Sequence, residues 1–204
     1  MHNACSFYLN ADEQLLVAVP FIDEGLLHGE RCIVVSDDTE TWQRAYPGAA
    51  VTEDAAGAGV SLWPSVSWQP PGKFNSLAMA KHVWSAIEDA LASSSGVRFV
   101  VDMAWTQSSQ VLSSAVCHWE ATLDALITAD TPVRVLCQYS RSSLPVATLH
   151  AGLRTHPFVH TGEHAVANPH YEAEAILENE PLLNECSSDP ELVGRLLAPF
   201  LSNG

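Results

Sequence analysis

Aromatic and polar side chains follow several short apolar runs of the sequence, and they are the residues best suited to form a binding site. Tyr8 ends one such run, Asp102 and Trp105 follow a second, and Tyr139 follows a third. A pocket with aromatic walls and a few polar groups suits a small organic ligand. The alternative is that these aromatic side chains only cap a hydrophobic core, and their types and spacing leave both interpretations open.

The loop after the first apolar run lacks the residues that bind the phosphates of a nucleotide. A P-loop has the pattern G-x-x-x-x-G-K-[ST], because its backbone amides and its lysine hold the phosphates. Residues 9–13 are LNADE, with no Gly or Lys and with two acidic side chains. Residues 99–102 (FVVD) resemble a strand that ends in a magnesium-binding acid, but the partner loop is missing. We therefore expect no ATPase activity.

The nucleophilic side chains do not form a catalytic motif that we recognise. There is no G-x-S-x-G sequence, which would present a serine at a strand-to-helix turn. Cys117 and His118 are adjacent in a predicted helix, where consecutive side chains point in different directions. We therefore predict that the chain is not an enzyme. The alternative is acid–base or thiol chemistry carried out by Asp102, Cys5 or Cys137.

Metal binding is a more open question, because nine histidines and five cysteines supply many donor atoms. Cys137 lies at the end of a predicted strand, and His156 could approach it from a loop. However, no CxxC pair occurs, and buried cysteines are usually inert thiols that pack as small hydrophobic residues. We predict no metal and no cofactor, with metal binding or redox sensing by these residues as the alternatives.

The composition favours a folded acidic domain and argues against nucleic acid as a partner. The chain has 204 residues with 9 basic and 24 acidic side chains, a net charge of −15, whereas phosphate-backbone binders are rich in Lys and Arg. Hydrophobic residues make up 47% of the chain, enough for a sizeable core. The odd number of cysteines, the lack of a signal peptide and the lack of a long apolar segment predict a cytoplasmic protein without membrane contact.

The hydrophobic pattern predicts an α/β fold with a mainly parallel sheet and helices on both faces. Near-continuous apolar strands are expected at residues 4–8, 32–35, 97–101 and 133–137, alternating with segments of helical period. Ligands of such sheets bind outside the carboxyl ends of the strands. That rule brings the aromatic and polar residues that follow the strands to one edge of the sheet.

Four local features give more specific expectations. Asn10 and Glu13 form a capping pattern at the start of a helix. In that helix a stripe of Leu15, Val19, Ile22 and Leu26 is expected to face the core, and Pro20 is expected to interrupt or kink it. Residues 55–71, rich in Gly and Pro, are expected to form a long excursion or an irregular hairpin, and a closing helix is expected from residue 189 to residue 200.

Six segments of the sequence carry a resemblance to one known family. They are residues 2–8 (HNACSFY), 20–32 (PFIDEGLLHGERC), 102–105 (DMAW), 136–139 (LCQY), 155–157 (THP) and 168–171 (NPHY). In this order and spacing they resemble the MEDS domain, the methanogen/methylotroph DcmR-type sensory domain. The chain departs from the family pattern at Asn3, where the family usually has His, and at Asp102, where Glu is common.

The resemblance implies a RecA/KaiC-like fold without a functional P-loop, and a signalling role. Such domains occur alone or joined to DNA-binding or kinase modules, and they are proposed to sense small molecules such as hydrocarbon derivatives. Carried over residue by residue, the matching family positions are Cys5, Tyr8, Glu24, Gly25, Gly29, Glu30, Asp102, Trp105, Cys137, Tyr139, His156 and Pro157.

We therefore expect a MEDS-like sensory domain over residues 1–178, followed at 179–204 by a tail and helix that pack on it or contact a partner. The chain would be a stand-alone cytoplasmic sensor that binds a small molecule and passes the signal to a partner regulatory protein, as a monomer or a homodimer. The expected ligand-binding residues are Cys5, Tyr8, Asp102, Trp105, Cys137, Tyr139 and His156. The alternative is an interaction module without a ligand, steered by its negative charge toward a basic partner.

Overall fold

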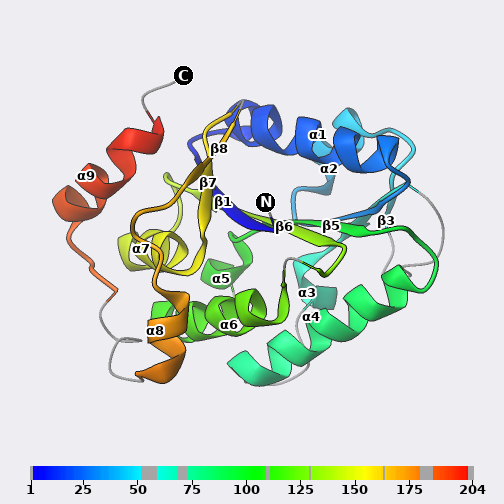
Figure 1. Cartoon of the computed structure of the whole chain (residues 1–204). Helices are drawn as coiled ribbons and strands as arrows, with labels where there is room; N and C mark the ends of the chain where they lie inside the picture. Colours follow the sequence, from blue (N-terminus) through cyan, green and yellow to red (C-terminus); the bar gives the residue numbers. More distant parts are fainter. Residues whose placement is uncertain are drawn as a thin grey trace.

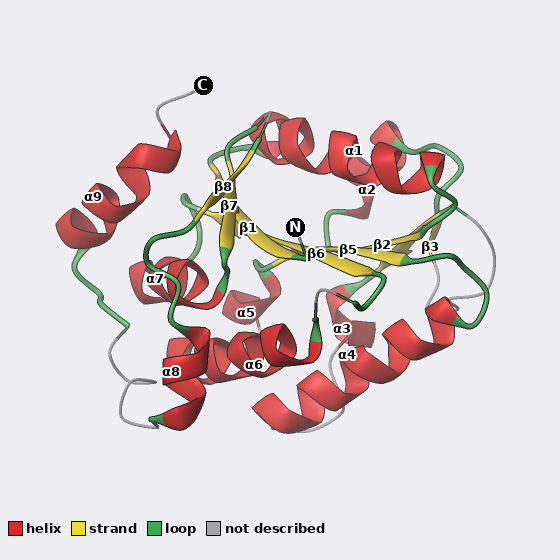
Figure 2. Ribbon diagram, viewed as in Figure 1, coloured by secondary structure: helices red, strands yellow, loops and turns green. Residues whose placement is uncertain are grey.

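In the computed structural model, a sheet forms the middle layer of the molecule and helices cover both of its faces (Figures 1 and 2). The structure describes residues 2–51, 59–68, 73–108, 111–128, 130–162, 164–179 and 186–201. Within these residues the sheet has eight strands in the order β3-β4-β2-β5-β6-β1-β7-β8. Neighbouring strands are parallel except β7 and β8, so the predicted fold class is confirmed. The arrangement is compatible with a RecA-like α/β fold.

The elements follow one another in an alternating order along the chain. The strands are β1 (Asn3–Tyr8), β2 (Arg31–Val35), β3 (Ala50–Val51), β4 (Val60–Trp63), β5 (Val97–Asp102), β6 (Val133–Ser140), β7 (Phe158–His160) and β8 (Ala165–Ala167). The helices are α1 (Ala11–Leu27), α2 (Thr39–Ala45), α3 (Ser65–Trp68), α4 (Ser76–Leu91), α5 (Trp105–Ser108), α6 (Ser113–Leu126), α7 (Val146–Thr155), α8 (Ala173–Glu178) and α9 (Pro190–Leu201). No helix of this described part is both long and apolar enough for a bilayer crossing.

Two hydrophobic cores lie on the two faces of the sheet, because successive side chains of a strand point to opposite faces. Figure 2 shows α1 and α2 on one face and α4 and α6 on the other. Along β1, Ala4 belongs to the core under α1, whereas Cys5 and Phe7 belong to the core on the α4 and α6 side. Along β6, Leu136 and Cys137 divide in the same way. This alternation decides which candidate site residues can meet.

Helix α1 begins as its sequence predicts. The Asn10 side chain accepts a hydrogen bond from the Glu13 backbone amide at 3.0 Å, and the Glu13 carboxylate accepts one from the Leu9 amide at 2.8 Å. This arrangement resembles a capping box, except that Glu13 binds the amide of Leu9, one residue before the N-cap. It places a carboxylate at the helix start, where a nucleotide-binding protein would hold phosphate.

The expectation for the interior of α1 is partly wrong. The helix runs through Pro20 without ending there. The predicted stripe contributes only Ile22 to the fully buried set, which consists of Gln14, Val17, Ala18, Phe21, Ile22 and Gly25. Apolar residues occur all around this helix, so their spacing does not select one face. Gly25 does mark the buried face, because a Cβ at this position would lie 2.6 Å from Arg98 Cδ on β5.

The interpretation of residues 55–71 as irregular is wrong for the part that the structure describes. Strand β4 lies within this segment and pairs in parallel with β2, extending the sheet. Its last residue, Trp63, packs edge to face on Phe99 with ring centroids 6.1 Å apart, and Trp68 lies 5.5 Å from the same ring. Residues 52–58 and 69–72 lie outside the described part. The closing helix is present as α9, which contacts α7 and buries Val193.

Candidate functional site

The structure divides the seven predicted site residues into separate groups. Cys5, Cys137, Tyr139 and His156 come together in the core on the α6 and α7 side of the sheet. Tyr8 and Asp102 form a second group, at the carboxyl ends of β1 and β5. Trp105 belongs to neither group and packs among the rings of Phe74 and Trp119. The two groups are separated by the sheet, because Tyr8 and Asp102 occupy alternate positions to Cys5 and Cys137 along the strands.

The first group surrounds a buried carboxyl group that the sequence analysis did not select, that of Glu120 on α6. Tyr139 donates a hydrogen bond from its hydroxyl to the Glu120 carboxyl, and Thr155 donates one at 2.9 Å. His156 donates from Nδ1 to the carbonyl oxygen of Gly152, 2.8 Å away, since a carbonyl can only accept. Helix α7 fits tightly here, because a Cβ added at Gly152 would lie 2.6 Å from Tyr139 Cζ.

Burial favours the neutral forms of the titratable groups of this cluster. It raises the pKa of the Glu120 carboxyl and lowers the pKa of the His156 imidazole. It also raises the pKa of the Cys5 and Cys137 thiols well above their usual range, and Glu120 adds to that effect. Among the described residues, Glu120, Cys137 and His156 could hold a metal ion, because one donor atom of each lies within 4.8 Å of the other two.

The second group is a hydrogen-bonded network at the carboxyl edge of the sheet. Tyr8 donates its hydroxyl to Asp102 Oδ1 at 2.9 Å, Ser36 donates to Oδ2 at 3.2 Å, and the Ala104 amide donates to Oδ1 at 3.1 Å. Burial raises the pKa of Asp102, and these hydrogen bonds act in the opposite direction. The described side chains therefore satisfy Asp102 without a ligand.

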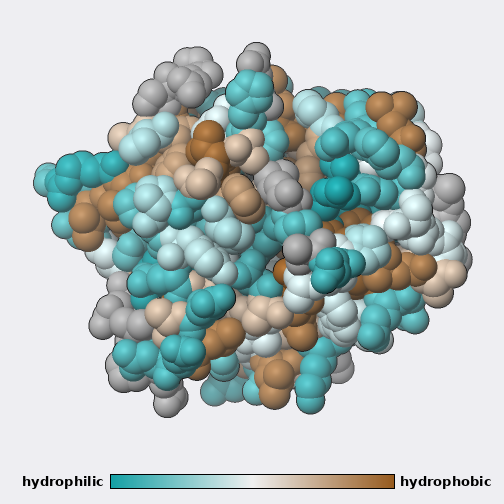
Figure 3. Space-filling view, viewed as in Figure 1, coloured by the Kyte–Doolittle hydropathy of each residue, from teal (hydrophilic) through white to brown (hydrophobic). Residues whose placement is uncertain are grey.

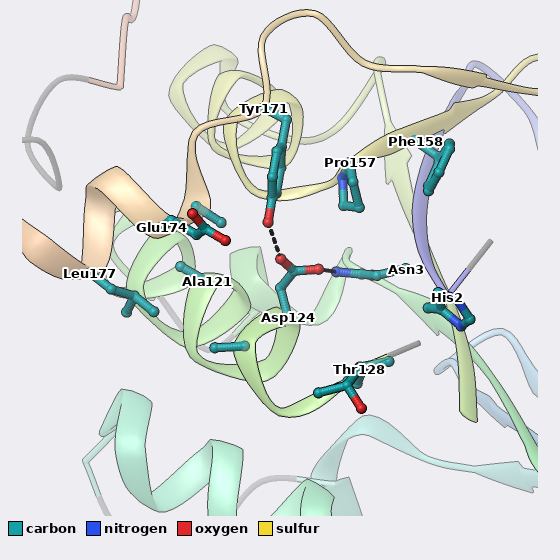
Figure 4. Close-up of a pocket in the computed structure, with 13 residues that line it drawn as sticks. His2, Asn3, Ala121, Asp124, Thr128, Pro157, Phe158, Tyr171, Glu174 and Leu177 are labelled. Carbon is teal, nitrogen blue, oxygen red and sulfur yellow. Dashed lines mark hydrogen bonds between the residues drawn. The ribbon is translucent and has the colours of Figure 1, made fainter. Parts of the chain in front are cut away.

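A pocket of about 380 Å³ opens at the other edge of the sheet, where β1 and β7 begin (Figure 4). Its lining residues are His2, Asn3, Ala121, Asp124, Ala125, Ile127, Thr128, Pro157, Phe158, Tyr171, Ala173, Glu174 and Leu177. Asp124 is the central polar group, because it accepts hydrogen bonds from Asn3 Nδ2 at 2.8 Å and from the Tyr171 hydroxyl at 2.5 Å. The walls around it are mostly apolar. This is the opposite edge to the one that the sequence predicts.

The pocket and the buried cluster are neighbours along three elements. On β1, Asn3 lines the pocket and Cys5 lies two residues further on the same side of the strand. On α6, Asp124 lies one turn after Glu120. After α7, Pro157 lines the pocket directly after His156 of the cluster. Four of the seven sequence-predicted site residues thus belong to a cluster that lies directly inward of a pocket that the sequence did not locate.

The two acidic residues missed by sequence reasoning were detectable in part. Glu120 follows Val116 by four residues and precedes Leu123 by three, so at helical spacing it lies on the same face as these two apolar side chains. Glu120 therefore had to face the core. Asp124 carries no such signal, because its partners Asn3 and Tyr171 are distant in sequence.

A third cluster joins α6 to the C-terminal part of the chain. Cys117 is buried and Cys186 packs against it, and Arg154 donates to Cys186 Sγ at 3.6 Å. The hydrogen bond from Cys117 and the charge of Arg154 lower the pKa of the Cys186 thiol. Since the thiolate is the reactive form, Cys186 has the chemical character of a reactive cysteine.

We expect Cys186 to be the first cysteine of the native protein to react with iodoacetamide. Its reaction should continue below pH 8, where an ordinary thiol with a pKa of about 8.5 is mostly protonated. Peptide mass spectrometry after timed alkylation measures the rate at each cysteine. Replacement of Arg154 by Gln should move the pH midpoint for Cys186 upward. Faster reaction of the buried Cys5 or Cys137 would contradict the assignment.

The fold and these sites define an α/β domain compatible with the RecA-like class. The Glu13 carboxylate lies at the start of its first helix, and the preceding residues contain no glycine-rich loop. The chain belongs to the MEDS family: the family model described as "MEthanogen/methylotroph, DcmR Sensory domain" matches residues 4–157. The suspected membership is confirmed, and with it a sensory role. A comparison with curated proteins found no match.

Proposed function

We propose that this sensory domain binds a small, largely apolar molecule in the pocket around Asp124 and passes the signal to a separate regulatory protein. The observation that carries the proposal is the pocket itself. Its volume of about 380 Å³ falls in the range of small-molecule sites, and it combines apolar walls with a few convergent polar groups. The sensory role of the family supports a ligand as the input.

The polar groups of the pocket favour a ligand that donates a hydrogen bond. Among the described residues, Asn3 Oδ1 is buried without a hydrogen-bond partner, which is an unfavourable state for an acceptor. Burial raises the pKa of Asp124, against the effect of its bonds to Tyr171 and Asn3. A short alcohol or amine would donate to these oxygens and place its carbon chain against Phe158 and Leu177. A functionalised hydrocarbon of this size is therefore the ligand class that we propose.

The signal would leave through the helices that border the pocket. Ala173, Glu174 and Leu177 of α8 line the pocket, and α8 contacts α6, whereas α9 packs on α7. Figure 3 shows hydrophobic side chains gathered near α9, among hydrophilic ones. We propose that a ligand-dependent shift of these helices alters a partner surface. Such a shift needs two conformers with different ligand affinity.

The test is a panel of short alcohols, amines, ketones and carboxylic acids, followed by thermal unfolding and by tryptophan fluorescence. A ligand at 100 times its Kd stabilises the native state by about 2.7 kcal/mol. We expect stabilisation by one hydrogen-bond-donating member of the panel, and loss of that stabilisation in Asp124→Ala. Asp124→Asn keeps an acceptor and should bind more weakly than the wild type.

Asp89→Ala is the matched control, because it removes the same side chain from an exposed site on α4. It should respond as the wild type does. Asp102→Asn and Tyr8→Phe test the predicted ligand role of the carboxyl-edge group in the same assay. Silence across the panel, or an unchanged response in Asp124→Ala, would overturn the proposal. Silence together with capture of a specific basic protein would favour the alternative of an interaction module, with its net charge of −15 as the attractive field.

A further inference from the structure

Three side chains with metal-binding chemistry meet in the core beneath the sheet, apart from the pocket proposed for the ligand. Glu120 comes from α6, Cys137 from β6, and His156 from the end of α7. They are 2%, 1% and 1% exposed, and one donor atom of each lies within 4.8 Å of the other two. We propose that they form a binding site for a divalent transition metal ion, with zinc as the occupant. The inference does not depend on the proposed function.

The charges of the three groups match a divalent cation. Burial disfavours a carboxylate or thiolate that no cation accompanies, so it favours the protonated forms of Glu120 and Cys137 while the metal is absent. When Zn²⁺ binds, the Glu120 carboxyl and the Cys137 thiol each release one proton, and neutral His156 contributes a nitrogen lone pair. Two negative charges then balance the two positive charges of the ion. Two protons leave for each zinc bound, and no oxidant or reductant is required.

Hydrogen bonds with neighbouring residues hold His156 and Glu120 in fixed orientations, as is usual for metal ligands. His156 Nδ1 donates to the Gly152 carbonyl oxygen at 2.8 Å, so Nε2 is the ring nitrogen with a free lone pair. A backbone carbonyl in this role fixes the tautomer of a metal-binding histidine. The Glu120 carboxyl is held by the hydroxyls of Tyr139 and Thr155. Ligating carboxylates are supported by hydrogen bonds in the same manner.

The donor set favours zinc over the hard cations. Magnesium and calcium prefer sets made of oxygen atoms, whereas one thiolate, one imidazole and one carboxylate suit zinc. Three protein ligands leave a fourth position for water or a small ligand. Cys5 lies opposite Cys137 in the register of β1 and β6, and it is outside the set of three. It therefore supplies a control.

The experiment starts from protein that is unfolded with a chelator and refolded with or without zinc. After removal of free metal, we expect one zinc per chain. At free zinc 100 times its Kd, the unfolding equilibrium constant should fall about 100-fold. X-ray absorption at the zinc edge should report one sulfur ligand together with nitrogen and oxygen ligands. That measurement uses the wild type and does not depend on whether any variant folds.

Two variants and one control separate the site from adventitious binding. Cys137→Ser should lose the one-to-one stoichiometry, whereas Cys5→Ser should keep it. Thr155→Val removes a supporting hydrogen bond and should weaken zinc binding by about 10- to 100-fold. A wild type that refolds without retaining zinc would overturn the proposal. So would zinc bound only through oxygen, or equal affinity in Cys137→Ser. The zinc measurements are made without any ligand of the pocket, so failure here is distinct from failure of the proposed ligand pocket.

Discussion

Replacement of Arg98 by methionine is expected to lower the free energy of unfolding by about 3–5 kcal/mol, the cost of breaking a buried ion pair by removing one partner. Arg98 is 1% exposed and reaches from β5 to three acceptors. It donates to Glu24 at 2.7 Å, to the Phe21 carbonyl at 2.6 Å, and to Glu30. Methionine keeps most of the side-chain volume, so the loss reports the charge network and not a cavity. Urea denaturation measures it.

Glu24→Gln is the control for the exposed side of the same network. The Glu24 side chain is 62% exposed, so its pair with Arg98 is screened by water. We expect a loss of about 0–1 kcal/mol for this variant. Glu30, in contrast, is 9% exposed and also binds Arg134 at 2.6 Å. Equal losses in Arg98→Met and Glu24→Gln would show that the buried charge is not what holds α1 to the sheet.

The Arg98 network explains one of the sequence segments that resemble the MEDS family. Glu24 and Glu30 of that segment are the acidic partners of Arg98. Gly25 lies against the same side chain, because a Cβ at this position would be 2.6 Å from Arg98 Cδ. Gly29 has φ +69°, a left-handed conformation that glycine adopts without strain. This segment therefore serves the packing of α1 on the sheet.

The regular part of the fold could be predicted because its apolar periods are strong. In strand β2, for example, residues 32–35 are all apolar and all buried, and the Asn10 cap marks the start of α1. Strand β4 could not be predicted in this way. It is short, and Gly59 with φ +114° directly precedes it, so the local sequence has the character of a turn. Pairing with β2 and the packing of Trp63 on Phe99 overcome that local signal.

The candidate site was predicted only in part. The prediction considered which residues lie near the strand ends, but not to which face of the sheet each side chain points. Tyr8 and Tyr139 both lie near the carboxyl ends of adjacent strands, and this suggests one pocket. Tyr139 shares its face of the sheet with Phe7, its neighbour in register, and the two rings stack at 5.4 Å. Tyr8 follows Phe7 by one residue, so its side chain points to the other face of the sheet. A shift of one residue reverses the face, so a ligand site cannot be assembled from strand ends alone.

Trp105→Ala is expected to lower the free energy of unfolding by about 3–5 kcal/mol, the usual cost of truncating a buried tryptophan. The sequence leaves two roles for this residue, the wall of an open pocket or a cap on the core. The structure places it at 2% exposure, with the rings of Phe74 and Trp119 each 5.7 Å away.

If Trp105 formed the wall of an open ligand site, its truncation would abolish ligand binding but leave most of the stability of the protein. Thermal and urea unfolding, compared with Trp105→Phe, separate these roles, because phenylalanine keeps the aromatic contacts and leaves a smaller cavity. A large loss in the alanine variant with a small one in the phenylalanine variant would identify Trp105 as part of the core that holds β5 and α6 together. A stability loss below about 1 kcal/mol in Trp105→Ala, in the range of surface substitutions, would return Trp105 to the ligand-binding residues.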